Sequence, residues 1–196
     1  MFPVTRNRWV TFDCYGTLVP SLPADAHGRL SSEGGPNRPF NDVESLLAEL
    51  RRRGYKLGVL TNCDDAQFEA AHRTFRKPFD LFVTAERIRA RKPDLWHFRA
   101  FQLLAQVRKD HWVHIAADWQ QDIVPAEAFG IHRVWLDRDG TGEPRRVGPR
   151  TRTDQPALLG VGSHSDPTGG GAHVHTAADA VRAVDWLFQD QAACAS

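Results

Sequence analysis

The sequence predicts an α/β fold built on a Rossmann-like, doubly wound parallel sheet. Short apolar runs alternate with helix-length amphipathic segments after residue 40, which is typical of a parallel sheet covered on both faces. Several of these apolar runs also end abruptly in polar side chains. Open α/β sheets bind their ligands at the carboxyl ends of their strands, so this pattern favours the same fold.

Each element follows from a local pattern. The apolar run 9–12 ends in Asp13 and a Gly-Thr turn, which predicts a buried strand. A cap at Asn41 or Asp42 and an apolar face predict a helix that Gly54 ends. Further strands are predicted at 56–61, 79–83, 112–117 and 131–136, with an edge strand at 172–176. Further helices are predicted at 64–75, 92–107 after its first turn, 123–129 and 177–188.

Two stretches interrupt this alternation. Residues 19–39 contain four prolines and a Gly-Gly pair, which predicts a loop. Residues 138–172 are rich in Gly, Pro, Arg and Ser, which predicts a long flexible loop. A length of 196 residues suits one domain with a substantial core, so residues 1–196 are expected to form a single domain.

The composition excludes several classes of function. The net charge of +1, from 25 basic and 24 acidic residues, gives no field that attracts nucleic acid or an anionic membrane. No apolar run approaches the roughly 20 residues that a membrane span needs. The first residues lack the apolar core of a signal peptide, and three cysteines do not form a disulfide framework. A cytoplasmic location is therefore expected.

Polar side chains that can take part in catalysis or binding occur at four of the predicted strand or helix ends. They are Asp13, Thr61, Asn62, Lys92, Asp118 and Asp122. Taken singly, each has an ordinary structural explanation, such as helix capping by an acid. Together, a carboxylate, a hydroxyl, a lysine and paired acids in this order resemble the four motifs of the haloacid dehalogenase superfamily. The run FDCYGTL at 12–18 looks most like its dehalogenase branch, where tyrosine replaces the second aspartate of the phosphatases.

The resemblance implies a covalent mechanism. Asp13 would be the nucleophile and would form an aspartyl ester that water then cleaves. Thr61 and Lys92 would assist, the lysine by neutralising negative charge. The groups expected to bind the anionic oxygens of the substrate are those of Tyr15, Gly16, Thr17 and Asn62. The expected substrate is phosphorylated or otherwise anionic.

The resemblance to the phosphatases of this superfamily also implies a magnesium ion, and oxygen-only ligands suit this cation. Its expected ligands are Asp13, the main-chain carbonyl of Tyr15, Asp118 and Asp122. A rival register aligns Ala117 with the missing acid, which places Asp118 one position out and leaves the metal without that ligand.

The chain departs from both branches of the family. Tyr15 stands where phosphatases carry a second aspartate, whereas Phe98, Ala117 and Trp119 depart from the dehalogenase pattern. A magnesium-dependent phosphatase is the first hypothesis because Asp118 offers a ligand. A 2-haloacid dehalogenase-like hydrolase is the second hypothesis, and a non-catalytic binding or regulatory protein is the third.

The intervals between the motifs leave little room for the cap domain that the resemblance implies. The predicted helix and strand at 41–61 use most of the chain between Asp13 and Thr61, and 19–39 is short and proline-rich. We therefore expect an essentially capless fold with an open site. Such a site suits a macromolecular substrate, or a lid contributed by another copy of the chain or by a partner protein.

His173 and His175 alternate in the predicted edge strand, so their side chains would lie on the same face. Because the sequence offers no third ligand at a suitable spacing, exposed edge-strand histidines are favoured over a metal site.

Overall fold

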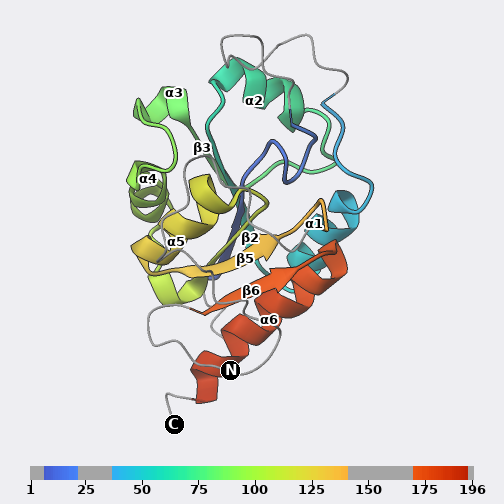
Figure 1. The fold of residues 1–196 in the computed structure, drawn as a ribbon, viewed down its shortest axis with the longest axis vertical. Coiled ribbons are helices and arrows are strands. Elements are labelled where there is room, and N and C mark those ends of the chain that lie inside the picture. The colour runs from blue at the N-terminus through green and yellow to red at the C-terminus, as the bar shows by residue number, and fades with distance from the viewer. Residues whose placement is uncertain (1–6, 22–36, 141–169, 194–196) are drawn as a thin grey trace, which may run out of the picture.

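The computed structural model describes residues 7–21, 37–140 and 170–193. Its centre is a six-stranded, all-parallel sheet with the strand order β3-β2-β1-β4-β5-β6 (Figure 1). The strands are β1 (Trp9–Phe12), β2 (Lys56–Thr61), β3 (Leu81–Thr84), β4 (Trp112–Ala116), β5 (His132–Leu136) and β6 (Gly171–Val174). This architecture confirms the predicted Rossmann-like α/β fold.

Helices cover both faces of the sheet. They are α1 (Val43–Arg52), α2 (Asp65–His72), α3 (Ala85–Ile88), α4 (Trp96–Ala105), α5 (Val124–Phe129) and α6 (Ala177–Ala193). Side chains of α1, α2 and α6 share one apolar core with the sheet, whereas those of α4 and α5 belong to a second core. The sheet is therefore the middle layer of three.

The chain changes direction across the sheet after β3. The strands β1 to β3 succeed one another towards one edge, and β4 then returns to the other side of β1. β1 and β4 therefore flank the topological switch point, where doubly wound sheets form their ligand crevice. Thr11 of β1 pairs in register with His114 of β4, which aligns the carboxyl ends of the two strands.

The element boundaries agree closely with the predicted ones, with a few corrections. The helix predicted within 92–107 after its first turn spans Trp96–Ala105. The edge strand begins at Gly171 and ends at Val174, instead of spanning 172–176. Three short elements were not predicted: α3, a 3₁₀ turn at Lys109–His111 and a π-helical turn at Trp119–Ile123.

The two predicted loops fall mainly on residues 22–36 and 141–169, which lie outside the described residues. Among the helices that the structure does describe, none combines the length and apolar character needed to cross a bilayer.

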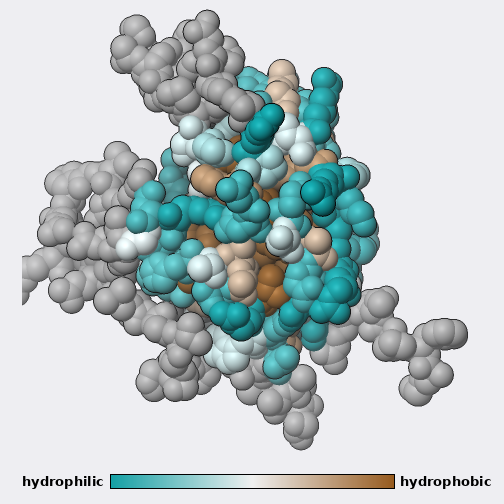
Figure 2. Space-filling model, turned by 90° about the vertical axis from the view of Figure 1, so that its right-hand side faces the viewer, coloured by the Kyte–Doolittle hydropathy of each residue, from teal (hydrophilic) through white to brown (hydrophobic). Residues whose placement is uncertain are grey.

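One face of the molecule is largely hydrophilic, with a few apolar residues showing between the polar ones near its middle (Figure 2).

Candidate active site

The carboxyl ends of three neighbouring strands bring most of the predicted site residues together. β1 lies between β2 and β4, so Asp13, directly after β1, lies between Thr61 at the end of β2 and the segment that follows β4. The main-chain N–H of Asp13 donates to the carbonyl of Ile115 at 3.2 Å, which holds the end of β1 against β4.

The carboxylate of Asp13 is buried and held from both sides. The residue is 7% exposed. Its Oδ1 accepts a hydrogen bond from Nζ of Lys92 at 2.7 Å, and its Oδ2 accepts one from the hydroxyl of Thr17 at 3.2 Å. The same hydroxyl oxygen accepts from the N–H of Ala117 at 3.0 Å. Thr17 therefore links Asp13 to the segment after β4, which carries the paired acids Asp118 and Asp122 and corresponds to the fourth motif.

A tight turn follows Asp13. Gly16 has φ = 86°, in the left-handed region that favours glycine, and a Cβ there would lie 3.0 Å from the hydroxyl of Ser21. The N–H of Leu18 closes the turn on the carbonyl of Cys14 at 2.8 Å. Among the described residues, the N–H groups of Tyr15 and Thr17 have no hydrogen-bond partner. The turn thus offers two main-chain donors beside a buried carboxylate.

Lys92 is the centre of charge in this site. Its Nζ contacts Oδ1 of Asp13 at 2.7 Å, Oδ1 of Asp122 at 2.6 Å and the carbonyl of Leu60 at 3.0 Å. An ammonium group has three N–H bonds, so each one has an acceptor. Burial lowers the pKa of Lys92, but the two carboxylates outweigh burial and raise it. The lysine therefore stays charged.

The two carboxylates that share Lys92 are not equivalent. Burial raises the pKa of Asp13 to about 6, the charge of Asp122 adds to the increase, and Lys92 opposes it. For Asp122, burial also raises the pKa, but Lys92 and His114 outweigh it, so the pKa lies below its ordinary value. On acidification Asp13 therefore takes up a proton before Asp122 does.

Asn62 holds Lys92 through its main chain. The Asn62 side-chain amide accepts from the N–H of Lys92 at 2.7 Å and donates to its carbonyl at 3.1 Å. The same amide donates to Oε1 of Gln121 at 2.7 Å. The hydroxyl of Thr61 is buried and lies 3.1 Å from Sγ of Cys63. The hydrogen bonds of Asn62 thus position the main chain of Lys92.

A chain of buried hydrogen bonds beneath Asp122 was missed by sequence reasoning. His114 is fully buried, with Nε2 at 3.0 Å from Oδ1 of Asp122 and Nδ1 at 2.9 Å from the hydroxyl of Thr11. Nε1 of Trp112 donates to that hydroxyl oxygen at 2.8 Å. Burial lowers the pKa of His114.

The direction of this chain follows from the groups in it. A carboxylate only accepts, so the neutral imidazole of His114 donates from Nε2 to Asp122 and accepts at Nδ1 from Thr11. An indole N–H only donates, so Trp112 donates to Thr11. The bonds therefore run in one direction, from Trp112 through Thr11 and His114 to Asp122. The sequence signal for this chain was the presence of two polar residues, Thr11 and His114, within apolar strands. Their pairing could not be predicted without the register of the two strands.

Two predicted site residues have other described contacts. The hydroxyl of Tyr15 donates to the carbonyl of Gln67 at 3.1 Å. The carboxylate of Asp118 accepts from the N–H of Gln121 at 2.8 Å and so caps the π-helical turn. Asp118 nevertheless directly follows Ala117, which Thr17 links to Asp13. Oδ1 of Asp122, which was predicted as a metal ligand, contacts both Lys92 and His114.

Comparison with known proteins assigns the family. The sequence profile of the haloacid dehalogenase-like hydrolases matches residues 30–136, more than half of the chain. The chain belongs to the haloacid dehalogenase-like hydrolases. This matched range contains Lys92 and Asp122 but begins after Asp13, so the assignment of Asp13 depends on its position in the structure.

Two curated relatives of this hydrolase represent two reactions. The chain is 28% identical to the (S)-2-haloacid dehalogenase of Pseudomonas sp. strain YL over 105 residues, covering 52% of this chain and 44% of the relative. It is 30% identical to the phosphoserine phosphatase of Thermus thermophilus over 120 residues, covering 58% and 46%. The chain therefore spans less than half the length of these two relatives.

A solved structure supports the fold of this hydrolase over nearly its whole length. An uncharacterized protein from Listeria monocytogenes serotype 4b superimposes with a TM-score of 0.68 at 18% sequence identity. The superposition covers 93% of this chain and 99% of that one.

Proposed function

We propose that this haloacid dehalogenase-like hydrolase cleaves phosphate esters with Asp13 as its nucleophile. The observation that carries the proposal is the buried carboxylate of Asp13, held by Lys92 at 2.7 Å at the carboxyl end of the central strand. The main-chain donors of the following turn lie beside it. This arrangement provides an oriented nucleophile, a fixed positive charge and donors for anionic oxygens in one place.

The reaction proceeds in two displacements. An oxygen of Asp13 attacks phosphorus, the bond to the ester oxygen breaks, and the alcohol leaves after taking a proton from solvent. Water then attacks the aspartyl phosphate, which releases inorganic phosphate and regenerates the carboxylate. Lys92 balances the negative charge of the nucleophile throughout, and Thr17 fixes the orientation of the carboxylate through Oδ2. The N–H groups of Tyr15 and Thr17 are placed to receive phosphoryl oxygens.

The donor set beside Asp13 fits magnesium. Hard oxygen ligands are what this cation prefers. The carbonyl of Tyr15 accepts no hydrogen bond from the described residues, and one oxygen of Asp118 is not used by its capping bond to Gln121. Asp13, Tyr15 and Asp118 would therefore hold the ion, and Asp122 would remain with Lys92. When bound, magnesium supplies positive charge that reduces repulsion between the carboxylate and the anionic substrate.

A 2-haloacid dehalogenase activity is the second candidate, and Tyr15 favours it. A phosphatase of this family uses a second aspartate at this position to protonate the leaving group, whereas a halide leaves without a proton. Here the Tyr15 hydroxyl is bonded to the carbonyl of Gln67, so no acid stands there. In the phosphatase proposal the leaving alcohol must therefore obtain its proton from solvent, which favours substrates with acidic leaving groups.

The substrate in this proposal is a phosphorylated or similarly anionic molecule that reaches an open site. A macromolecular substrate would cover the open site with its own surface. A second copy of the chain, or a partner protein, would enclose a small substrate in the same way.

A panel of phosphate esters and 2-haloacids, assayed with and without magnesium, tests the proposal. Phosphate release that requires magnesium and is lost in Asp13→Asn supports it. The matched control is Asp110→Asn, which removes a surface carboxylate next to the start of β4, and full activity is expected there. Halide release that is lost in Asp13→Asn would instead establish the dehalogenase. Lack of turnover on the whole panel would favour a binding protein.

A further inference from the structure

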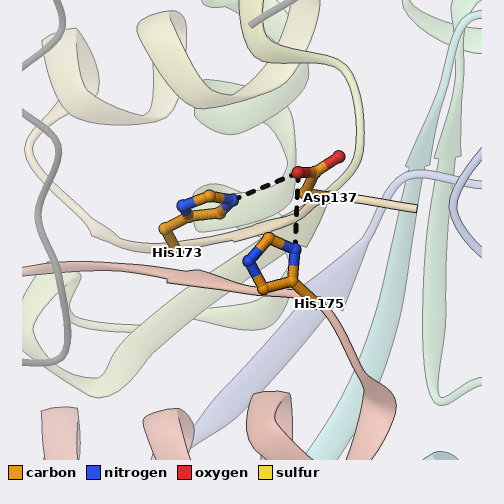
Figure 3. A group of neighbouring side chains, drawn as sticks. All are labelled: Asp137, His173 and His175. Atoms are coloured by element: carbon orange, nitrogen blue, oxygen red, sulfur yellow. Dashed lines mark ion pairs between the residues drawn. The ribbon is translucent and has the colours of Figure 1, made fainter. Parts of the chain in front are cut away.

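A second cluster of polar side chains lies at the carboxyl ends of β5 and β6. Asp137 directly follows β5, while His173 belongs to β6 and His175 follows it. Figure 3 shows both imidazole rings directed at the carboxylate of Asp137. Oδ2 of Asp137 lies 3.4 Å from Nε2 of His173 and 3.4 Å from Nδ1 of His175. The three ligand atoms all lie within 4.8 Å of one another.

These distances suit a shared metal ion better than direct hydrogen bonds. Protein N–H···O bonds have separations of about 2.7–3.2 Å between nitrogen and oxygen. In a tetrahedral site with metal–ligand bonds of about 2.0–2.1 Å, two ligand atoms lie about 3.4 Å apart. Consistent with this, Nε2 of His173 is buried and has no hydrogen-bond partner among the described residues.

The surroundings of the cluster orient its members. The N–H of Gly140 donates to Oδ1 of Asp137 at 3.0 Å, and Oδ2 faces the two rings. The ring of His173 stacks on the indole of Trp135, with centroids 4.2 Å apart and an interplanar angle of 17°. The side chains of Asp137 and His173 are 4% and 17% exposed, whereas that of His175 is 56% exposed. A metal ion would thus have two oriented ligands and access through the third.

We propose that Asp137, His173 and His175 form a binding site for a divalent transition metal, with zinc as the best-fitting ion. Two imidazoles and one carboxylate are a donor set that suits zinc, which leaves a fourth position for water. The ion would join the ends of β5 and the edge strand β6, which are far apart in the sequence. A metal that closes a long loop stabilises the folded state by restricting the unfolded chain.

The site is separate from the proposed phosphatase centre. β5 and β6 lie beyond β4 in the sheet, so Asp137 is two strands away from the strand that carries Asp13. Zinc binding at the cluster therefore does not rest on the proposed function.

Calorimetric titration of the full chain with zinc chloride tests the site, after removal of any affinity tag and treatment with chelator. We expect one zinc ion per chain at this cluster and a higher midpoint of thermal unfolding. Replacing one ligand, in His175→Gln or Asp137→Asn, should weaken this binding by at least about 100-fold, beyond the loss typical of residues that merely orient ligands. Because His175 is largely exposed, His175→Gln is expected to fold normally, which keeps the comparison valid.

Two controls separate this cluster from other zinc ligands. His111→Gln removes a histidine directly before β4, at the amino ends of the strands, whereas the cluster lies at their carboxyl ends. Asp13→Asn alters the proposed active site. Both variants should retain the zinc affinity of the wild type. The proposal is overturned if the wild type takes up no zinc at tens of micromolar. It is equally overturned if His175→Gln and Asp137→Asn bind zinc as tightly as the two controls.

Discussion

Lys92 and Asp122 form a buried ion pair, with 2.6 Å between Nζ and Oδ1 and side chains that are 1% and 2% exposed. A buried pair of this kind is stable only when its remaining donors and acceptors are satisfied. Here Leu60 and Asp13 accept the other two N–H bonds of the lysine, and His114 gives Oδ1 of the acid a second hydrogen bond. The pair thereby directs a fixed positive charge at Asp13.

The Asp13→Asn variant is expected to lose hydrolytic activity and to gain stability at neutral pH. The pKa of Asp13 is about 6 in the folded protein and 3.8 as its ordinary value, so the folded state disfavours the charged form. Stability from this group is therefore highest at low pH and falls as the pH rises through about 6. At about 1.4 kcal/mol per pKa unit, the gain in Asp13→Asn reaches at most about 3 kcal/mol.

Denaturant unfolding with chelator present measures this gain. The difference between Asp13→Asn and wild type should be large at pH 7.5 and small near pH 4. An equal difference at both pH values would contradict the assignment of the raised pKa to Asp13.

The pH profile of the reaction should show an acidic limb. A protonated Asp13 is not a nucleophile, so kcat/KM should fall about tenfold per pH unit below about pH 6 and level off above it. The profile is best measured with a substrate that does not titrate in this range. Bound magnesium stabilises the carboxylate, so saturating magnesium should move the limb to lower pH. A profile without an acidic limb, or a limb that magnesium does not move, would argue against Asp13.

Lys92→Ala should destabilise the protein strongly. It leaves Asp13 and Asp122 buried without a counter-charge, which costs about 3–5 kcal/mol. Urea unfolding should also show partial recovery as the pH falls, because protonation removes the uncompensated charges. The control is Lys77→Ala at an exposed position, where a change of less than about 0.5 kcal/mol is expected. A similarly small change in Lys92→Ala would contradict the buried ion-pair network.

His114 is expected to position Asp122 instead of contacting the substrate. His114→Leu keeps much of the packing against Phe98 but removes the donor to Asp122, which should cost about 1–3 kcal/mol of stability. It should lower kcat more than it changes KM, because Lys92 then loses its fixed orientation.

A double-mutant cycle separates this positioning role from packing. The effects of His114→Leu and Asp122→Asn should be strongly non-additive, with a coupling of more than about 0.5 kcal/mol. Additive effects would show that His114 acts only by filling space.

Magnesium should stabilise the wild type through Asp118. A ligand that binds only the folded state at about ten times its Kd adds roughly 1.4 kcal/mol. A thermal-shift titration should therefore show stabilisation in the wild type and in His175→Gln, but not in Asp118→Ala. If Asp118→Ala responds like the wild type, the rival register is correct, in which Ala117 aligns with the missing acid and Asp118 is not a ligand.

The sequence predicted the strand ends well because each polar side chain interrupts an apolar run. Asp13, Thr61 and the acids after β4 lie at one edge of the sheet for that reason. The pairing of Thr11 with His114 was not predictable, because it depends on the register of two strands far apart in the chain. The third ligand near His173 and His175 escaped for the same reason, since Asp137 approaches them only through the pairing of β5 with β6.

In the proposed reaction, the three satisfied N–H bonds of Lys92 would affect how substrates are selected. An incoming anion gains long-range attraction from the ammonium group but no new hydrogen bond, unless it displaces the neutral carbonyl of Leu60. In the proposed reaction, discrimination between substrates would therefore depend on the turn after Asp13, whose main-chain donors would recognise the shape of the anionic group. Inhibitors of this protein should accordingly be optimised against the geometry of that turn, and additional negative charge aimed at the lysine should bring little affinity.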